Sequence, residues 1–453
     1  MIALLAAAAF SFGTCSDALC GGDTLAPVMA KLAGARAGRG RPVHILQIGD
    51  SHTAGDTITG AWRDTLQGRF GIGGRGVLPP GRPYDGYITH GVTVSMSTGW
   101  RIAADFGKGW SDPHPPLGLS AFSLTSEAEG ASMSLVADPQ EAFNRLVVCA
   151  IAKAGAGALT IRIGGQDEQM DLGSITERPQ CRTMRSDQPQ ATASLTAQGG
   201  PVTVTSWATF ADGKGGVALS NLGVVGSQLI HFSRTDDAVL AEELRAYAPD
   251  MIVLAFGTNE GFAGRFSAFE YEIILRTQIG RIRRLAGNVP ILLLGAPDAL
   301  TRRADLLANA GGAPSVTCPD VTLPVVAAAP PAAPQPSNAL AGAMARLGYA
   351  FGIGDDPAAA PAAQPPAPAP AVKGGLFPPQ ALAEVRAIQR RVAASLNVAY
   401  WDWEARMGGR CTARAWVRAT PPLMRGDYVH YTSAGGHEIA ERLQADLDKV
   451  GKR

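Results

Sequence analysis

The sequence predicts an α/β fold: a three-layer α/β/α arrangement around a mostly parallel sheet, with an all-β sandwich inserted into it. The first observation is a set of continuous apolar runs at residues 43–49, 251–256 and 291–295. Runs of this length, bounded by turn residues, are typical of parallel strands that are covered on both faces. The second is a period-two pattern between residues 99 and 215, which indicates antiparallel strands.

Helical patterns alternate with the apolar runs. One set of apolar residues repeats at three- and four-residue steps: Leu382, Val385, Ile388, Val392 and Leu396. Another set shares one helix face near the C-terminus: Ile439, Leu443 and Leu447. A shorter strand is expected between them, at residues 398–401. Because strands and helices alternate along the chain, helices are expected to cover a parallel sheet.

The inserted β-sandwich divides the chain into segments. We expect a signal peptide or N-terminal extension at 1–22, the first part of the α/β domain at 23–98, the sandwich at 99–215 and the second part of the α/β domain at 216–453. In the sandwich, Leu159, Ile161 and Ile163 alternate with polar neighbours, as do Val202 and Val204. Residues 322–376 are dominated by alanine and proline. Such a segment buries too little apolar surface to offset its ordering entropy, so disorder is expected there.

Charge and hydropathy argue against several classes of partner. The 40 basic and 39 acidic residues give a net charge of +1, and no long like-charge run is present. Neither a nucleic acid nor an anionic membrane surface is therefore expected as a partner. The apolar residues 1–10 are too short to span a bilayer, but they have the length of a signal-peptide core. We expect a periplasmic or secreted protein without an integral membrane segment.

Neither a metal nor another cofactor is expected. The six cysteines, at positions 15, 20, 149, 181, 318 and 411, lack the CxxC spacing of zinc sites, and the chain has only seven histidines. In an exported protein we expect the disulfides Cys149–Cys181 and Cys318–Cys411, with buried free thiols as the alternative. Residues 71–76 (GIGGRG) match the dinucleotide-binding pattern, but no helix follows them.

Ser51 is the candidate nucleophile. It follows Gly49 and Asp50 at the end of the first apolar run, where a strand stops and glycine lets the backbone turn sharply. A hydroxyl at this position stands at the rim of a sheet, where open α/β sheets bind their ligands. The alternative is a serine that only caps the following helix.

His430 is the candidate base, with Asp427 three residues before it. In a D-x-x-H turn both side chains can lie on the same side, so the carboxylate can accept the imidazole Nδ1–H and fix the tautomer. The alternative is that the aspartate caps a turn and the histidine lies on the surface. His52, His231 and His437 are weaker candidates for the base.

Three groups are candidate donors to an oxyanion. Asn259 follows the apolar run 251–256, which places its amide at the carboxyl edge of the sheet. Gly226, in the segment NLGVVGS (221–227), lets a backbone N–H approach a substrate oxygen, and the N–H of Ser51 is the third donor. The alternatives are an Asx turn at Asn259 and an ordinary strand–helix glycine at Gly226.

At these positions the chain resembles the SGNH/GDSL hydrolase superfamily. Four segments are similar to its sequence blocks, in the same order: Gly49-Asp50-Ser51, Gly226, Gly257-Thr258-Asn259 and Asp427-x-x-His430. The usual first block continues with leucine, where this chain has His52. The stretches GDSHTAGD, FGTNEGF, WDWEARMGG and DYVHYTSAGG are most like the peptidoglycan O-acetylesterases. A carbohydrate-binding-module-like β-domain inserted after the first block is a further similarity, whereas the Pro/Ala-rich segment is a departure.

The resemblance implies a serine esterase in which Ser51 attacks an ester carbonyl and His430, oriented by Asp427, takes its proton. The N–H groups of Ser51 and Gly226 and the amide of Asn259 would form the oxyanion hole. The expected partner is an O-acetylated cell-wall glycan, with peptidoglycan favoured, and the expected state is a monomer. The alternatives are another acetylated polysaccharide, a lipase or thioesterase, and a non-catalytic glycan-binding protein.

Overall fold

The computed structural model describes residues 15–303, 306, 318 and 375–450. Residues 1–14 of the expected N-terminal segment and residues 322–374 of the expected Pro/Ala-rich segment lie outside these ranges. Among the helices within the ranges, none has both the length and the apolar character that crossing a membrane requires.

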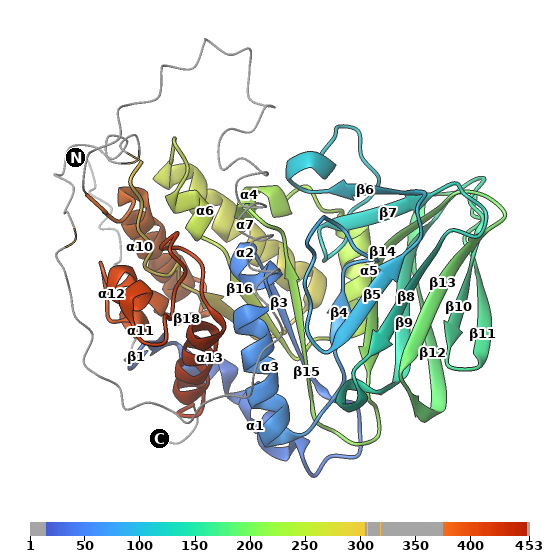
Figure 1. Cartoon of the computed structure of the whole chain (residues 1–453), viewed down its shortest axis with the longest axis horizontal. Helices are drawn as coiled ribbons and strands as arrows, with labels where there is room; N and C mark the ends of the chain where they lie inside the picture. Colours follow the sequence, from blue (N-terminus) through green and yellow to red (C-terminus); the bar gives the residue numbers. More distant parts are fainter. Residues whose placement is uncertain (1–14, 304–305, 307–317, 319–374, 451–453) are drawn as a thin grey trace, which may run out of the picture.

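A mixed sheet, the main sheet, organises the α/β part of the chain (Figure 1). Its strands lie in the order β1 (Cys15–Ser16), β2 (Leu19–Cys20), β18 (Ala399–Trp401), β17 (Ile291–Leu294), β16 (Met251–Ala255), β3 (Val43–Gly49) and β15 (Val217–Gly223). Neighbours from β18 to β15 pair in parallel, whereas β18–β2 and β2–β1 pair antiparallel. All the apolar runs that predicted strands therefore lie side by side in this sheet, and the expected α/β class is confirmed.

Helices pack on both faces of the main sheet. One face carries α1 (Ala26–Ala35), α3 (Thr57–Phe70) and α13 (Ser433–Leu447), and the other carries α5 (Asp237–Tyr247), α7 (Ala268–Ala286) and α10 (Gln380–Ser395). On β3, Ile45 belongs to the core of the first face and the next residue, Leu46, to the core of the second. Every residue of β3 is buried for this reason, which explains why apolar residues predominate on both faces of the strand instead of alternating with exposed polar ones.

Short helices follow the strands or connect the longer elements. They are α2 (Ser51–Ala54), α4 (Leu229–Phe232), α6 (Thr258–Gly261), α11 (Trp403–Met407) and α12 (Ala413–Arg418), with 3-10 turns η1 (Gly22–Leu25), η2 (Gly107–Gly109) and η3 (Pro139–Glu141). Because α2 and α6 follow the adjacent parallel strands β3 and β16, both begin at the same edge of the main sheet.

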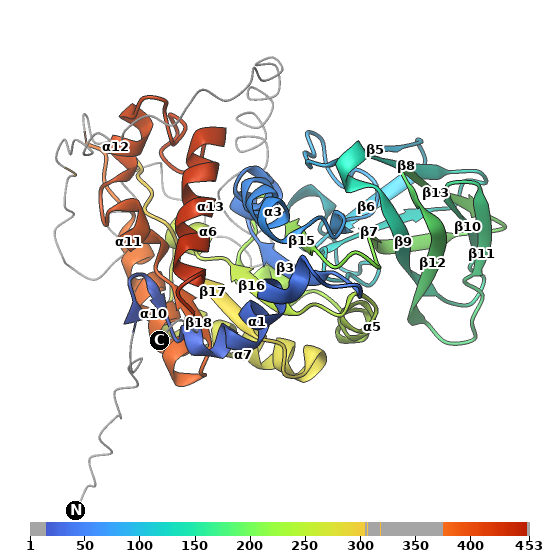
Figure 2. The ribbon, with the colours of Figure 1, turned by 90° about the horizontal axis from the view of Figure 1, so that it is seen from below.

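Two antiparallel sheets form the β region, which lies to the right of the main sheet in Figure 2. One has the order β11 (Gln166–Asp171), β10 (Ala158–Ile163), β13 (Thr192–Gln198), β8 (Ser132–Ala137) and β5 (Val92–Met96). The other has the order β12 (Arg178–Gln190), β9 (Phe143–Ala152), β14 (Val202–Phe210), β7 (Phe122–Ser126) and β6 (Trp100–Ala104), with β4 (Gly76–Leu78) paired to β14. Both sheets contribute to one apolar core. The strands β4 and β5 precede residue 99, so the β region also uses the chain before that position.

The strands of the β region differ in how strictly they alternate. Strand β10 alternates between buried and more accessible residues, as its sequence predicts. In β14 every residue is buried, including Thr203 and Thr205. The hydroxyl of Thr205 donates to Glu243 of α5 (2.7 Å), and this side chain also accepts the N–H of Leu119 (2.6 Å). Thr205 is therefore buried against α5 instead of facing solvent, and the hydroxyl of Thr203 is bonded to that of Thr125 on β7 (2.8 Å).

All six cysteines form disulfides. Cys149–Cys181 joins directly opposed residues of β9 and β12, and Cys318–Cys411 joins two segments that are 93 positions apart. Both pairings are as expected, and the alternative of free thiols is wrong. A third disulfide, Cys15–Cys20, was not expected and closes the β1–β2 hairpin.

Candidate active site

Three adjacent strands of the main sheet end at one level, and each leads to a candidate residue. Gly49, the last residue of β3, pairs with Ala255 of β16 on one side and with Gly223 of β15 on the other. The chain beyond β3 carries Ser51, and the chains beyond its two neighbours carry Asn259 and Gly226. Parallel pairing therefore brings these three segments to the same carboxyl edge of the sheet.

Ser51 is the first residue of α2, immediately beyond the turn that ends β3. A Cβ on Gly49 would lie 2.4 Å from Oγ1 of Thr53 and 2.5 Å from the carbonyl oxygen of Ala255, so only glycine fits between α2 and β16. Asp50 caps the helix, and its carboxylate accepts the N–H of the residue after Ser51 (2.9 Å). The N–H of Ser51 itself, at the first helical position, has no acceptor within the helix.

The structure brings His430 and Asp427 to Ser51. Nε2 of His430 lies 3.0 Å from Oγ of Ser51, and Nδ1 of His430 lies 2.9 Å from Oδ2 of Asp427. Because an ionised carboxylate can only accept, Nδ1 carries the proton and Nε2 can accept the serine hydroxyl. This arrangement has the nucleophile, base and orienting carboxylate that acyl transfer requires.

The carboxylate of Asp427 is held by its own turn. Its Oδ1 accepts the backbone N–H groups of Val429 (2.9 Å) and His430 (3.0 Å). Burial alone would raise the pKa of Asp427, but these hydrogen bonds and the neighbouring imidazole lower that pKa to about 2. Asp427 therefore stays ionised at neutral pH and keeps its role as an acceptor.

The turn that carries His430 is anchored by backbone contacts. The N–H of Arg425 donates to the carbonyl of His430 (2.8 Å), and the carbonyl of Tyr428 accepts the N–H of Leu300 (3.1 Å). Tyr428 has a φ of 61°, in the left-handed region that non-glycine residues seldom adopt. The turn is thus held in an unusual conformation by hydrogen bonds at both of its sides.

The other candidate histidines have different partners. Nδ1 of His231 accepts the N–H of Gln228 (3.0 Å), and its ring stacks on Phe106 at 4.4 Å. His437 is exposed on α13. Nδ1 of His52 lies 3.2 Å from Oδ1 of Asp50, and its Nε2 lies 3.0 Å from the carbonyl oxygen of Val429. The contact with the hydroxyl of Ser51 is made by His430, the predicted base.

Asn259 and Gly226, the other two oxyanion candidates, lie on segments that are hydrogen-bonded to each other. Asn259, on α6, donates one amide hydrogen to the carbonyl of Ser227 (2.9 Å), and Gln228 donates to the carbonyl of Asn259 (3.3 Å). A side-chain amide has two donor hydrogens, so the second one can serve a substrate oxygen. Gly226 directly precedes Ser227 and has a φ of 80°, which glycine adopts without strain.

One residue in this site, Glu260, was not found from the sequence, and a second, His52, was considered only as a weaker candidate base. Glu260 is buried beside Asn259 and accepts the N–H of Leu229 (2.7 Å), which ties α6 to the segment of Gly226. Burial raises the pKa of Glu260 to about 7. The only sequence signal of Glu260 was its position next to the asparagine, and the contacts of His52 are described below.

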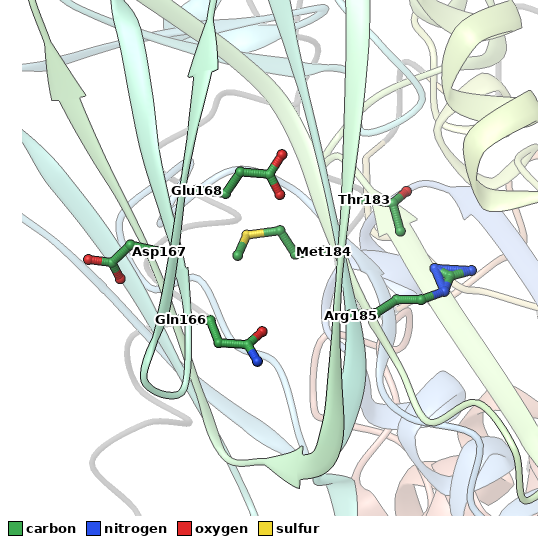
Figure 3. Close-up of a pocket in the computed structure, with 6 residues that line it drawn as sticks. All are labelled: Gln166, Asp167, Glu168, Thr183, Met184 and Arg185. Atoms are coloured by element: carbon green, nitrogen blue, oxygen red, sulfur yellow. The ribbon is translucent and has the colours of Figure 1, made fainter.

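A separate cavity of about 490 Å³ lies between β11 and β12 of the β region (Figure 3). Figure 3 shows Glu168 and Met184 extending into the space between the strands, whereas Asp167 points away from it. Glu168 is paired with Arg182 (2.5 Å). Because β11 and β12 lie at the far end of the molecule from α2 in both whole-chain views, this cavity is not part of the site at Ser51.

Comparison with known proteins defines the fold. No protein-family model and no curated protein sequence matches the chain. The fold is of the α/β class that the resemblance to the SGNH/GDSL superfamily implies. The candidate site lies at the carboxyl edge of its main sheet. Among solved structures it is shared with a peptidoglycan O-acetylesterase, which is 23% identical, with a TM-score of 0.66 over 94% of this chain and 96% of that chain. The expected resemblance is thereby confirmed at the level of the fold.

Two other solved structures are more distant. A salicylyl-acyltransferase from a tetracycline biosynthetic pathway is 13% identical, covers 82% of this chain and 96% of its own, and has a TM-score of 0.30. An acetyl xylan esterase is 14% identical, covers 51% of this chain and 80% of its own, and has a TM-score of 0.27. At these TM-scores, neither structure supports a conclusion about this chain.

Proposed function

We propose that the protein is a serine esterase that removes O-acetyl groups from a cell-wall polysaccharide, with peptidoglycan as the favoured substrate. The observation that carries the proposal is the hydrogen-bonded series Ser51–His430–Asp427, with distances of 3.0 Å and 2.9 Å. The series lies at the carboxyl edge of the main sheet, where folds of this type bind ligands.

In the proposed reaction, Ser51 Oγ attacks the acetyl carbonyl while Nε2 of His430 takes the hydroxyl proton. The ionised Asp427 stabilises the imidazolium that forms. His430 then gives the proton to the departing sugar oxygen, which leaves an acetyl group on Ser51. Water, activated by the same imidazole, releases acetate and restores the serine.

The oxyanion formed in both steps would be held by the N–H groups of Ser51 and Gly226 and by the amide of Asn259. These donors come from three neighbouring strand ends that are braced against each other, so they would be in place before the substrate binds. Preorganised donors of this kind stabilise a transition state because no reorganisation is needed as the charge develops.

The choice of substrate rests on the fold. The structure shares its fold over nearly its whole length with a peptidoglycan O-acetylesterase. As part of the proposal, the β region is a carbohydrate-binding β-sandwich inserted into a three-layer α/β/α domain. The three disulfides favour an oxidising compartment, which supports a periplasmic or secreted location.

The variant Ser51→Ala tests the nucleophile. It should lower kcat on p-nitrophenyl acetate by a factor on the order of 10⁴ or more and leave the melting temperature close to that of the wild type. Turnover at the wild-type rate in this variant would exclude Ser51 as the nucleophile. Labelling of Ser51 by a fluorophosphonate separates an enzyme from a non-catalytic glycan-binding protein, because an idle serine does not react.

The substrate class is tested by acetate release from O-acetylated peptidoglycan and from acetylated xylan under the same conditions. Faster release from peptidoglycan is expected, and faster release from xylan would favour another acetylated polysaccharide. A series of acetyl, butyryl and octanoyl esters examines the lipase or thioesterase alternative. Rates that rise with chain length would favour that alternative.

A further inference from the structure

The ring of His52 lies between two oxygen atoms that accept hydrogen bonds. Its Nδ1 is 3.2 Å from Oδ1 of Asp50, and its Nε2 is 3.0 Å from the carbonyl oxygen of Val429. A backbone carbonyl cannot donate a hydrogen bond, and neither can an ionised carboxylate. Both contacts are hydrogen bonds at the same time only if both ring nitrogens carry a proton, which makes the ring an imidazolium.

One of the two contacts, from Nε2 to Val429, joins the two halves of the proposed catalytic pair, and the other, from Nδ1 to Asp50, fixes the ring within its own turn. Asp50 immediately precedes Ser51, and Val429 immediately precedes His430. The ring centroid of His52 lies 5.4 Å from that of His430, and the side chain of His52 is buried. The hydrogen bond of Nε2 therefore ties the turn of the nucleophile to the turn of the base, next to the point where Ser51 meets His430, and the bond of Nδ1 holds the ring in the orientation that this tie requires.

We propose that His52, as an imidazolium, is a positioning residue that holds the Ser51 turn against the His430 turn. This inference rests on the proposed esterase function. The physical reason is that acyl transfer requires the hydroxyl and the imidazole at hydrogen-bonding distance, and a displacement of about 1 Å can cost on the order of 10²-fold in rate.

The charged groups around His52 support its protonation. Asp50 faces it from the α2 turn, and Asp427 contributes from the turn of His430. Burial alone would lower the pKa of His52, but these carboxylates and the hydrogen bond to Val429 raise it above its ordinary value. The ring also packs against Tyr431 at 5.7 Å, whose pKa burial raises well above its ordinary value, so this phenol stays neutral.

The sign of the pH dependence follows from this raised pKa. The imidazolium and both of its hydrogen bonds are fully present below pH 6.5, the ordinary value for histidine. They are lost as the pH rises through the higher value of the folded protein. Once the ring is neutral, one nitrogen has no proton to donate, so the ring loses either its bond to Val429 or the bond to Asp50 that fixes its orientation. The activity should therefore decline on the alkaline side of that value.

His44 offers a matched control. It is also buried, on the same strand–turn segment, and its ring nitrogens contact the carbonyl of Tyr247 (3.0 Å) and Oγ of Ser220 (2.7 Å). Because a hydroxyl can donate as well as accept, His44 needs only one ring proton. Burial lowers the pKa of His44 to about 4, so this ring is neutral at pH 7.

The test compares His52→Leu, His44→Leu and Ser51→Ala with the wild type on p-nitrophenyl acetate, from about pH 6 to about pH 10. His52→Leu should lower kcat by roughly 10- to 100-fold while KM stays within about threefold, because only the geometry of the reacting groups changes. The alkaline decline of the wild type should be missing in His52→Leu. His44→Leu should keep the wild-type kcat and the alkaline decline.

The outcomes separate the two proposals. An inactive wild type, or a Ser51→Ala variant as active as the wild type, would overturn the esterase proposal and this inference with it. If the wild type is active through Ser51 but His52→Leu keeps the wild-type kcat and pH profile, only the role of His52 is wrong. Equal losses of kcat in His44→Leu and His52→Leu would also overturn it, because the effect would then be one of general packing.

A second measurement does not depend on the folding of His52→Leu. The chain has seven histidines, so wild-type protein labelled with ¹⁵N-histidine gives few ring signals. The signal of His52 is assigned with the conservative variant His52→Gln, which keeps a donor group. At about pH 6, below the ordinary pKa of histidine, both ring nitrogens of His52 should be protonated, whereas His44 should show one protonated nitrogen. A neutral His52 ring at that pH would overturn the proposal.

Discussion

Nε2 of His430 lies 3.0 Å from Oγ of Ser51, although 379 positions separate the two residues in the sequence. Each is presented by a turn that its own segment constrains. Gly49 permits the close approach of α2 to the sheet, and the two backbone N–H groups on Asp427 shape the turn of the imidazole. The contact between the two turns is the feature on which the proposed chemistry depends.

Replacing Asp427 with asparagine should lower kcat on p-nitrophenyl acetate by a factor on the order of 10² to 10⁴. The amide cannot stabilise the imidazolium and can favour the wrong tautomer of His430. The fold should persist, because an amide oxygen can still accept the N–H groups that Asp427 binds. Steady-state kinetics and circular dichroism of the variant check both statements. A variant with wild-type kcat would show that the carboxylate does not act on the base.

The variant Asn259→Ala should lower kcat by a factor on the order of 10² to 10³ with a smaller change in KM, because an oxyanion donor acts mainly in the transition state. Gln228→Ala is the matched control, since it removes the bond to the carbonyl of Asn259 and leaves the side-chain amide of Asn259 in place. Its effect on kcat should be less than about tenfold. Equal effects of the two variants in the same assay would mean that Asn259 acts only through the fold of α6.

Gly226→Ala should lower both activity and stability. At a φ of 80° an alanine is strained by roughly 1 to 2 kcal/mol, and its Cβ would lie 3.0 Å from the ring of Phe106. Adding Phe106→Ala should recover part of the loss, because it removes the clash but not the backbone strain. Denaturant unfolding and kinetics of the two single variants and the double variant give the coupling energy between positions 226 and 106. A coupling energy of zero would mean that the Phe106 ring does not restrict the side chain at position 226.

Asp105 should make the stability of the protein depend on pH. It is buried, and burial raises its pKa to about 7 from 3.8, although the charge of Arg234 opposes the rise. A carboxyl with a raised folded pKa contributes stability that is full below about pH 4 and is lost as the pH rises to about 7. Compared with Asp105→Asn, the wild type should lose on the order of 4 kcal/mol across this window.

The measurement for Asp105 is denaturant unfolding of the wild type and Asp105→Asn at a series of pH values. The difference between them should level off above about pH 7, where the folded wild type carries the ionised form. Asp187→Asn, at an exposed position of β12, is measured in the same way as the control. A difference that does not vary with pH would contradict the raised pKa of Asp105.

Much of the fold could be predicted because its pattern is local. The apolar run that became β3 is buried on both faces, and this burial is visible in the residues themselves. The burial of Thr203 and Thr205 was not visible, because their hydroxyl groups are bonded to Thr125 of β7 and Glu243 of α5, two residues distant in the sequence. The disulfide Cys15–Cys20 was missed for a related reason, since the cysteines are opposed only once β1 and β2 pair.

For the candidate site, the sequence by itself determined which residue types stand at the strand ends and turns: Ser51 after β3, Asn259 after β16 and the Asp427–His430 pair before α13. Local turn chemistry is enough for that, because a strand end, a glycine and a cap are read within a few residues. Only the tertiary structure decided that Ser51 meets His430, and that His52 bridges their two turns. Such contacts join segments hundreds of residues apart, and they exist because parallel strands end at one level and the C-terminal turn packs over that edge.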